Sequence, residues 1–499
     1  MKHWSLAAST ATIALFAGHA QADVTPEQVW KSWQDLSASY GQTLTVGSTK
    51  TEGGALVVND LKSVTEKDGS RMESVVPEVR LTDKGDGTVE ITMSDSYTIA
   101  LTEADPAKGA EILVSQPGLS VIASGTPEAT DYAFTVPKLD VTLSKLNGKE
   151  AAAEGANFQV TLANLTGHYL IAPEGAGKKL DTEFAADSLA LAIKGKDPEN
   201  NSDVDLTASV SGLTGKGVGT LVGMDSAEFS DALKAGFATD VTGTYGPVAY
   251  TVNVTEAKGP TKISGSSQGG SIQVAMDAAR MLLQTQGKGV QLAMTSPDIP
   301  LPEVSLSYAE SGFKLLMPVA KSDTPQDFGF LAKFVDLTVS NDIWGMIDPT
   351  GQLPHDPATL VIDTKGTATL THDLMNEAEM AALGDAPPGQ LNSLDLTELH
   401  AKIAGADLTG AGAFTFDNSD MTTFQGVPAP TGKLDLKLVG GNALLDKLVA
   451  MGLLTQDDAM GARMMLSMFA KVVEGEEDTM TSTLEFKDKH FFANGQQLQ

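Results

Sequence analysis

The 499-residue sequence contains no cysteine, so disulfide bonds cannot stabilise the fold and the hydrophobic core must do so alone. Aromatic residues make up only 6% of the chain. No run of about 18 apolar residues follows the N-terminal segment, and we therefore expect no transmembrane segment in the mature chain. A hydrophobic fraction of 41%, with 49 glycines and 22 prolines, indicates a folded chain that is rich in turns.

Positive charge is also scarce. The chain has 34 lysines and arginines against 64 aspartates and glutamates, which gives a formal net charge of −30. A field of this sign repels the phosphates of nucleic acids and anionic lipid head groups. We therefore expect no nucleic-acid partner and no charge-driven adhesion to a membrane, and we attribute the excess of carboxylates to solubility.

The N-terminus has the three parts of an export signal. Lys2 precedes the apolar run 4–17, and the small-residue triplet Ala20-Gln21-Ala22 follows it. This pattern predicts a signal peptide over residues 1–22 that is cleaved after Ala22, and the loss of Lys2 then changes the net charge from −30 to −31. We predict a periplasmic protein, with an extracellular one as the alternative. An uncleaved helix at the membrane surface is the alternative to cleavage.

The mature chain is dominated by alternation of apolar and polar residues, which is typical of antiparallel strands with one buried face. The clearest case is a hairpin in which segments 75–81 and 89–93 alternate on either side of a turn at 83–87. Similar alternation recurs at residues 139–143, 158–162, 189–193, 204–210, 248–254, 304–308 and 434–438. We predict a mainly β protein with some α (α+β), in which short amphipathic helices pack on a large curved antiparallel β-sheet.

Helix signals are fewer. Thr25-Pro26-Glu27-Gln28 is a capping box with proline at the first helical position, and it predicts a helix that ends at Gly41. Other helices are predicted at residues 275–284, from Thr324 onward and at 371–383. A helical hairpin is predicted between residues 442 and 473, with Gly452 between its helices.

Composition divides the mature chain into three parts. A β-rich half spans residues 23–263, a Gly/Ser- and Pro-rich connector with the short helix spans 264–303, and a second β-rich half with the helical hairpin spans 304–499. The string L-T-G-x-G occurs at 213–217 and again at 408–412. We interpret its glycines as bulges or bends of a long sheet, with a true duplication of the two halves as the alternative.

One serine lies in a catalytic-type motif. Gly265-Ser266-Ser267-Gln268-Gly269 matches the G-x-S-x-G nucleophile elbow and makes Ser267 the candidate nucleophile of a serine hydrolase. Such an elbow needs a buried strand before the serine and a helix after it. Because residues 259–264 lack an apolar strand and no HGGG-type oxyanion loop is present, we favour a flexible connector over an active site.

Motifs for metal ions and cofactors are absent from the sequence. None of the five histidines of the mature chain has H-x-x-x-H or H-E-x-x-H spacing: His168, His355, His372, His400 and His490. Asp203 and Asp205 lack a twelve-residue calcium loop around them. The glycines at 215, 217 and 219 form no phosphate-binding motif. We predict no metal site and no cofactor.

Methionines form one stripe in the predicted helical hairpin. Met460, Met464 and Met468 recur at helical spacing. Thioether side chains adapt to irregular apolar partners, which makes this stripe a candidate ligand-binding surface. Packing in the protein core is the alternative, and it is the one we favour.

The C-terminal half resembles a known family. The segments 344–357 (WGMIDPTGQLPHDP), 404–412 (AGADLTGAG) and 491–495 (FFANG) are similar to those of domain-of-unknown-function family 2125, whose members are envelope proteins of alphaproteobacteria. The resemblance extends over most of the mature chain and implies no catalytic residue. More loosely, the L-T-G-x-G strands and the N-G ending resemble AsmA-like proteins, and this implies a long β-sheet groove that handles envelope lipids.

The tryptophan segment of this resemblance is interpreted as a structural corner. Asp348-Pro349-Thr350-Gly351 suits a type I turn, and Pro354 keeps the chain extended after it. Trp344 is then expected to be a buried anchor whose truncation to alanine costs about 3 kcal/mol.

Together these patterns favour a non-enzymatic exported protein whose β-sheet groove or scaffold binds a lipid or an envelope protein. Two alternatives remain: a serine hydrolase that uses Ser267, and a purely structural scaffold of the envelope.

Overall fold

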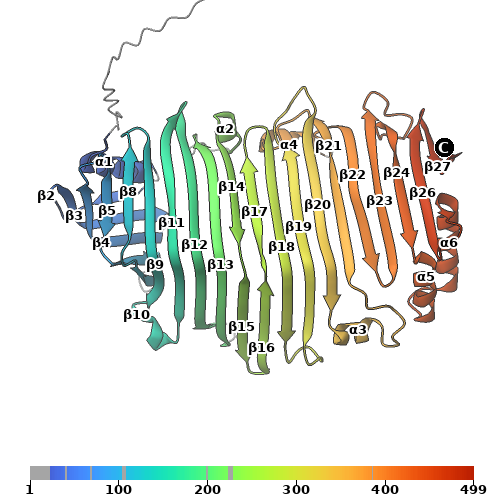
Figure 1. The fold of residues 1–499 in the computed structure, drawn as a ribbon, viewed down its shortest axis with the longest axis horizontal. Coiled ribbons are helices and arrows are strands. Elements are labelled where there is room, and N and C mark those ends of the chain that lie inside the picture. The colour runs from blue at the N-terminus through green and yellow to red at the C-terminus, as the bar shows by residue number, and fades with distance from the viewer. Residues whose placement is uncertain are drawn as a thin grey trace, which may run out of the picture.

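In the computed structural model, the described residues form one large antiparallel sheet of 28 strands (Figure 1). The structure describes residues 23–39, 42–67, 70–103, 108–197, 201–222, 229–384 and 386–499. Strands account for 63% of the chain and helices for 13%, which confirms the mainly β prediction. The predicted signal peptide, and Tyr40 and Gly41 at the predicted end of the first helix, lie outside the described residues.

The strands follow one another across the sheet as a meander, so that most hydrogen-bonded neighbours are also neighbours in sequence. In chain order they are β1 (Thr43–Thr45), β2 (Ser48–Glu52), β3 (Ala55–Lys67), β4 (Ser70–Asp83), β5 (Val89–Met93), β6 (Ser96–Thr102), β7 (Gly109–Ser115), β8 (Ser120–Gly125), β9 (Thr130–Leu146), β10 (Lys149–Glu150), β11 (Asn157–Glu174), β12 (Gly177–Lys196), β13 (Asp203–Leu221), β14 (Ala238–Tyr245), β15 (Val248–Glu256), β16 (Gly259–Ser267), β17 (Gly269–Met276), β18 (Arg280–Thr295), β19 (Val304–Pro318), β20 (Gln326–Val339), β21 (Ala358–Leu370), β22 (Gly389–Ile403), β23 (Ala406–Asp417), β24 (Ala429–Val439), β25 (Lys471–Val472), β26 (Thr479–Lys487), β27 (His490–Ala493) and β28 (Gln496–Gln497). The predicted hairpin is β4–β5, in which Leu81 pairs with Ile91.

Some pairs of short strands take the place of one long strand. Strands β14 and β15 both pair with β13, and β16 and β17 both pair with β18. Near the N-terminus, β5 and β6 share β4 as their partner in the same way. The break between the two short strands lies opposite the middle of the long strand that both of them pair with. A line through these breaks, perpendicular to the strands, divides the sheet into two halves.

Other long strands carry an irregularity at the same level. Asn164 in β11, Gly212 in β13 and Asp336 in β20 adopt left-handed backbone conformations, with φ of 50°, 61° and 55°. As in a β-bulge, such a residue shifts the alternation of side chains along its strand by one position. At Asp336 the register with β21 shifts as well, whereas Asn164 and Gly212 leave the register with their neighbours unchanged. We call all three positions bulges. The line of bulges therefore divides the sheet into two halves and changes the parity of the apolar residues between them.

The first helix closes the only large hydrophobic core among the described residues. Helix α1 (Pro26–Ser39) begins with the predicted capping box, since Gln28 N–H donates to Thr25 Oγ1 (3.3 Å) and Thr25 N–H donates to Gln28 Oε1 (2.9 Å). Its residues Val29 and Trp30 pack on the first strands of the sheet. The other buried members of this cluster are Val24, Leu56, Val58, Val76, Val79, Leu81, Val89, Ile91, Val121, Ala123 and Tyr132.

The helical hairpin at the other end is also confirmed. Helix α5 (Gly441–Ala450) is followed by α6 (Gln456–Phe469), whose first turn is capped by Thr455 as Asp458 N–H donates to its hydroxyl (3.1 Å). Arg463 of α6 donates to Asp446 of α5 (2.6 Å) and holds the two helices together. The hairpin lies beside β24 and β26 at the C-terminal end of the sheet (Figure 1).

Three short helices lie near the ends of strands (Figure 1). Helices α2 (Phe229–Lys234) and α4 (Glu377–Leu383) lie where the strands end on one side of the sheet, and α3 (Asn341–Ile347) lies at the opposite ends of the strands. Helix α4 occupies the second half of the helix predicted at 371–383, and Asn376 caps it.

Two predicted helices are wrong. Residues 275–284 belong to β17 and β18, which are joined by a turn in which Asp277 accepts from the N–H groups of Ala279 and Arg280. The residues after Thr324 form β20 instead of a helix. In both places the segment forms backbone hydrogen bonds with a neighbouring strand on each side. This pairing outweighs the local preference for a helix. The Gly/Ser-rich segment 264–271 is likewise part of β16 and β17, so the sheet runs through the predicted connector.

The interpretation of the L-T-G-x-G glycines as bulges is also wrong. Gly215, Gly217, Gly410 and Gly412 all pair with residues on both sides, and the one irregularity beside them lies in β22, between Leu396 and Leu399, opposite Gly410 and Gly412. A Cβ atom at Gly215 would clash with the ring of Phe184 on the neighbouring strand. The glycines therefore make room for large side chains from adjacent strands.

Candidate functional site

Paired residues of neighbouring strands point to the same side of a sheet, so the register of the strands shows which residues share a face. In the half of the sheet that contains α2, one such row crosses eighteen strands, from β3 to β26. Its members are Leu56, Leu81, Ile91, Val121, Phe134, Gly167, Phe184, Gly215, Gly243, Ile272, Thr285, Phe313, Ala332, Ile362, Leu399, Gly410, Leu436 and Ser482. No member of the row is charged.

The other half of the sheet has an equivalent row. It consists of Val141, Val160, Leu191, Ala208, Tyr250, Gly265, Leu292, Leu306 and Val339. The two rows belong to one face, because the bulges compensate for the change of parity between them. The N-terminal core shows this directly: Val76 and Val79 lie three residues apart, on the two sides of an irregularity, yet both are buried in the same cluster. The same offset of three separates Leu162 from Leu165 around the bulge at Asn164.

We call this side of the sheet the apolar face. In β11 to β23, the strand positions in register with the two rows contain two charged side chains, Lys178 at the outer end of β12 and Glu256 at the outer end of β15, which lie in opposite halves of the sheet. The opposite side carries the charges of these strands. One of its rows runs through His168, Glu183, Lys216, Thr242, Gln273, Gln284, Lys314, Leu331, Asp363 and Glu398.

Large side chains of the apolar face are exposed to solvent in the middle of the sheet. Their exposed fractions run from 37% to 45% for Phe184, Val241, Ile272, Val274, Phe330, Phe334 and Leu360. The accessible surface of the whole chain is 28488 Å², whereas a compact protein of 52.0 kDa exposes about 17,500 Å². The excess reflects a single layer of sheet with both sides accessible, and an exposed apolar surface of this extent is typical of an interaction site.

The apolar face is covered at its two ends. Helix α1 covers the N-terminal end, where Tyr132 is only 1% exposed. At the C-terminal end, Met465, Leu466 and Phe469 of α6 lie over Leu436 and the neighbouring apolar residues of β24 and β26. A cavity of about 210 Å³ remains between α6 and the strands, and its lining side chains are almost all apolar. The apolar face therefore continues beneath the hairpin.

The methionine stripe lies on the outer side of α6. Met460 and Met464 are each 63% exposed and Met468 is 53% exposed, so the favoured prediction that they pack in the core is wrong. Met465, one position further round the helix, lines the cavity above the sheet. Whether the exposed stripe binds a ligand is untested.

Ser267 does not lie in a nucleophile elbow. It ends β16 and is followed by β17, whereas the elbow needs a helix at this point. Its hydroxyl donates to the carbonyl of Lys288 (3.1 Å) and accepts from Gly269 N–H (3.1 Å), so it is part of the turn between the strands. No described histidine is hydrogen-bonded to it.

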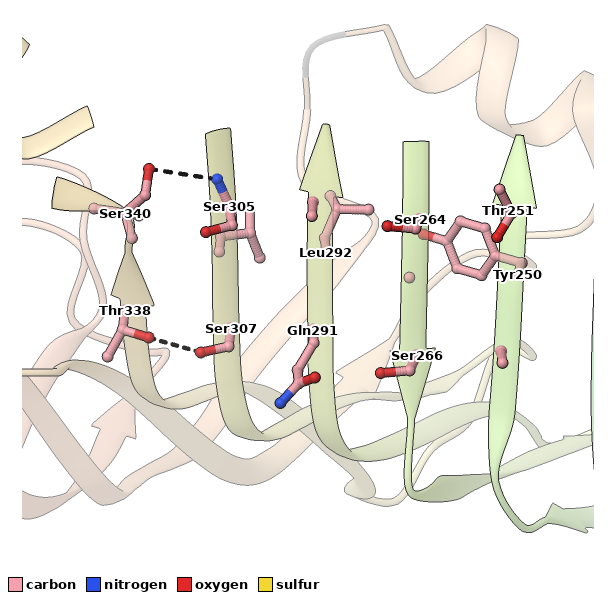
Figure 2. A pocket seen from close by; sticks show the side chains of 15 residues that line it. Tyr250, Thr251, Ser264, Ser266, Gln291, Leu292, Ser305, Ser307, Thr338 and Ser340 are labelled. Atoms are coloured by element: carbon pink, nitrogen blue, oxygen red, sulfur yellow. Dashed lines mark hydrogen bonds between the residues drawn. The ribbon is translucent and has the colours of Figure 1, made fainter. Parts of the chain in front are cut away.

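A hydroxyl-rich cavity lies close to this turn (Figure 2). Its volume is about 530 Å³, and strands β15, β16, β18, β19 and β20 line it. Ser307 and Thr338 share a hydrogen bond (2.7 Å), and Ser340 Oγ accepts from Ser305 N–H (3.4 Å). No charged residue or histidine lines the cavity, and its one titratable lining side chain is Tyr250.

The tryptophan corner has the predicted turn, but not the predicted burial. Gly351 N–H donates to the carbonyl of Asp348 (3.2 Å), and Gly351 has a φ of 65°. Asp348 accepts from Leu353 N–H (2.5 Å), a bond that lowers the pKa of its carboxyl. Trp344 is only half-buried and stacks on His355 with ring centroids 4.5 Å apart. It lies in α3 at the sheet edge, too far out to act as a core anchor.

The other histidines lie beside separate local partners. His168 is hydrogen-bonded to Asp131 (3.1 Å), His372 to the hydroxyl of Thr371 (2.9 Å) and His490 to the carbonyl of Asp488 (2.7 Å). His400 lies 3.1 Å from Asp407, without the geometry of a hydrogen bond. Within the described residues, no group of three acidic or histidine side chains could hold a metal ion.

A second polar cavity adjoins the apolar face where the cover of α1 ends. Its volume is about 420 Å³, and it lies between α1, residues 127–132 and the β11–β12 turn. Its charged lining residues are Lys31, Asp35, Glu128 and Lys178. Lys31 pairs with Asp35 (2.8 Å), whereas the side chains of Glu128 and Lys178 make no ion pair or hydrogen bond with any residue that the structure describes.

Tyr132 also lines this cavity. Its ring stacks on Tyr169 of the apolar face, with centroids 4.8 Å apart. Ser32 and Thr130 lie next to its hydroxyl, but the hydroxyl makes no hydrogen bond. Burial raises the pKa of both tyrosines, so the two side chains remain neutral. Sequence patterns did not reveal this site, because residues 32, 132 and 178 meet only through the fold.

Comparison with known families identifies the chain's relatives. A family model described as "Uncharacterized protein conserved in bacteria (DUF2125)" matches residues 232–493, which is 262 of 499 residues. The chain belongs to this family. The match begins within α2 and ends with β27, so it covers the open part of the apolar face from β14 onward and the helical hairpin. No curated protein and no solved structure matches the chain.

Membership of the DUF2125 family assigns no activity. None of the described helices is both long and apolar enough to cross a membrane.

Proposed function

We propose that this DUF2125 protein is a periplasmic lipid-binding protein that holds the hydrocarbon chains of lipids on its apolar face. The observation that carries the proposal is the apolar face between α1 and α6, which carries charged side chains only at the outer ends of two strands and whose large side chains are exposed. The predicted signal peptide and the loose resemblance to AsmA-like proteins support the same function.

The dimensions of the face suit hydrocarbon chains. From β11 to β22 it is ten strands wide, counting β14–β15 and β16–β17 as one strand each, and nine spacings of 4.8 Å give about 43 Å. The hydrocarbon core of a bilayer is about 30 Å thick, so one acyl chain extends about 15 Å. The face is long enough for several chains that lie across the strands.

The chemistry of the face favours lipid over protein. A protein interface forms about one hydrogen bond per 100–200 Å² and has a polar rim of paired groups. The strands already use the backbone donors and acceptors of this face, and its side chains are mostly aliphatic or aromatic. Alkyl chains need no polar partner, and each methylene they bury contributes about 0.8 kcal/mol.

Two-chain lipids are the expected ligands. Ten methylenes that are half-buried on an open face gain about 4 kcal/mol, which alone corresponds to binding near 1 mM. Two such chains gain about 8 kcal/mol, which corresponds to binding near 1 µM.

Native mass spectrometry of the purified protein, combined with organic extraction, tests the proposal. We expect two-chain lipids in the extract and adducts of matching mass on the protein. Ile272→Glu places a charge on the apolar face and should remove most of the lipid. Gln286→Glu is the matched control, because residue 286 lies on the opposite side of the neighbouring strand. Protein that stays free of lipid, even after incubation with phospholipid vesicles, would contradict lipid binding and favour a structural scaffold.

A further inference from the structure

The polar cavity beside α1 has the features of a head-group site. It lies at the end of the apolar face, and its lining combines unpaired charges of both signs with a buried polar group that lacks a partner. We propose that this cavity binds the head group of a phospholipid that carries both a phosphate and a primary ammonium group. The inference rests on the proposed lipid-binding function and specifies its ligand.

Lys178 provides the first argument. It is the one cation at an apolar-face position in β11 to β23, where the other charged side chain is Glu256 in the opposite half of the sheet, and it lies at the outer end of β12, next to Gly177. A charge at this place is costly to a purely apolar site but suits a phosphate at the end of an acyl chain. The side chain is exposed and makes no ion pair with the described residues, so within this part of the chain it is available to bind an anion.

Glu128 provides the second argument for a head-group site. Its carboxylate lines the same cavity, makes no ion pair or hydrogen bond, and can accept from an ammonium group. Among the described residues, the cavity thus has one cation and one anion without a partner, besides the paired Lys31 and Asp35. This balance disfavours a purely anionic head group, as does the net charge of −30 of the chain.

The aromatic residues argue against a quaternary ammonium group. Such a group is usually held by exposed aromatic faces. Here Tyr132 is 1% exposed and its ring is stacked on Tyr169, so it cannot form an aromatic cage. A primary ammonium group instead forms hydrogen bonds, for which the cavity offers Glu128 and the side-chain oxygens of Gln28 and Ser32.

The Tyr132 hydroxyl provides a further polar group. A buried hydroxyl without a partner is rare, because leaving it unbonded costs free energy. It lies within the wall of the cavity, beside Ser32 and Thr130, and has no accessible surface, so it makes the wall polar without touching the head group. The acyl chains of the same lipid would then extend past Tyr169 toward Phe184 on the apolar face.

A competition experiment tests the proposal. The full chain is incubated with vesicles that contain equal amounts of phosphatidylethanolamine, phosphatidylcholine and phosphatidylglycerol with identical acyl chains, and the bound lipids are extracted and counted. We expect phosphatidylethanolamine to be enriched about tenfold over phosphatidylcholine, as for a gained hydrogen bond to a charged group.

Two variants locate the site. Glu128→Gln should lower the enrichment toward the vesicle ratio without changing the total lipid bound. Lys178→Ala removes the partner of a phosphate that all three lipids share, so it should lower the bound amount of each lipid. Both residues are exposed, so the variants should fold. Lys179→Ala is the matched control, because residue 179 points to the opposite side of β12 and should leave both the enrichment and the bound amount unchanged.

The outcomes separate this inference from the function on which it rests. Lipids bound at the vesicle ratio, an enrichment of phosphatidylglycerol or phosphatidylcholine, or an enrichment that Glu128→Gln does not change would overturn the head-group site and leave lipid binding intact. A complete absence of bound lipid from all three would contradict the lipid-binding function itself.

Discussion

Two leucine truncations test whether the apolar face is open in solution. Leu81 is 0% exposed and lies in the core beneath α1, whereas Leu360 is 42% exposed on the apolar face of β21. Truncation of a fully buried leucine to alanine costs the transfer of its methyl groups and leaves a cavity, together about 3 kcal/mol. At Leu360 about half of the surface is already in water and no enclosed cavity forms, so we expect Leu360→Ala to cost about 1 kcal/mol.

Urea unfolding followed by far-ultraviolet circular dichroism measures both costs. The two substitutions remove the same atoms from strands of the same sheet, so differences in strand propensity cancel. We expect the midpoint to fall about three times further for Leu81→Ala than for Leu360→Ala, with an unchanged dependence on urea. Equal losses would refute the reasoning, because they would mean that another layer covers Leu360 in solution.

Two further predictions concern single side chains. Tyr132→Phe removes a buried hydroxyl without a partner and should raise the free energy of unfolding of lipid-free protein by about 1 kcal/mol; a loss of stability in urea unfolding would show that the hydroxyl is bonded. Trp344→Ala should cost only about 1 kcal/mol, since the indole is half-buried and stacks on His355; a thermal shift as large as that of Leu81→Ala would restore its role as a core anchor.

The strands and the terminal helices could be predicted from local patterns. Alternation in segments 75–81 and 89–93 is enough to define the hairpin β4–β5. The capping boxes at Thr25 and Thr455 locate the starts of α1 and α6, because a side chain must satisfy the first N–H groups of a helix.

The sequence could not decide between a strand and a helix where the local composition favours a helix but neighbouring strands offer backbone partners. Residues 275–284 are rich in alanine, methionine and leucine, which favour a helix in isolation. In the fold they extend into β17 and β18, whose neighbours β14 and β19 offer backbone partners on both sides. Such pairing is non-local, so the sequence of the segment contains no sign of it.

The apolar face was only partly predictable. Single-faced strands indicated one apolar side, but the change of parity at Asn164, Gly212 and Asp336 hides how the two halves of each strand combine. An offset of three between apolar positions, as from Leu162 to Leu165, is the signal that could have revealed the bulges. The head-group cavity depends on contacts between α1 and strands more than 90 residues away, and no local pattern encodes them.

The exposure of the methionine stripe shows the same limit. Helical spacing placed Met460, Met464 and Met468 on one side of α6, but it could not show which side faces the sheet. In the fold Met465, Leu466 and Phe469 face the strands, which leaves the stripe outside.

Photo-crosslinking of a bound lipid tests the central claim most directly. The protein is loaded with a two-chain phospholipid that carries a photoreactive group near the end of one acyl chain, and the crosslinked residues are mapped by mass spectrometry. We predict crosslinks to apolar-face residues such as Ile272, Phe330 and Leu360, and none to Lys216 or Gln284 on the opposite side. Crosslinks concentrated on the opposite side of the sheet, or on the outer face of α6 alone, would contradict the claim that the apolar face holds the lipid chains.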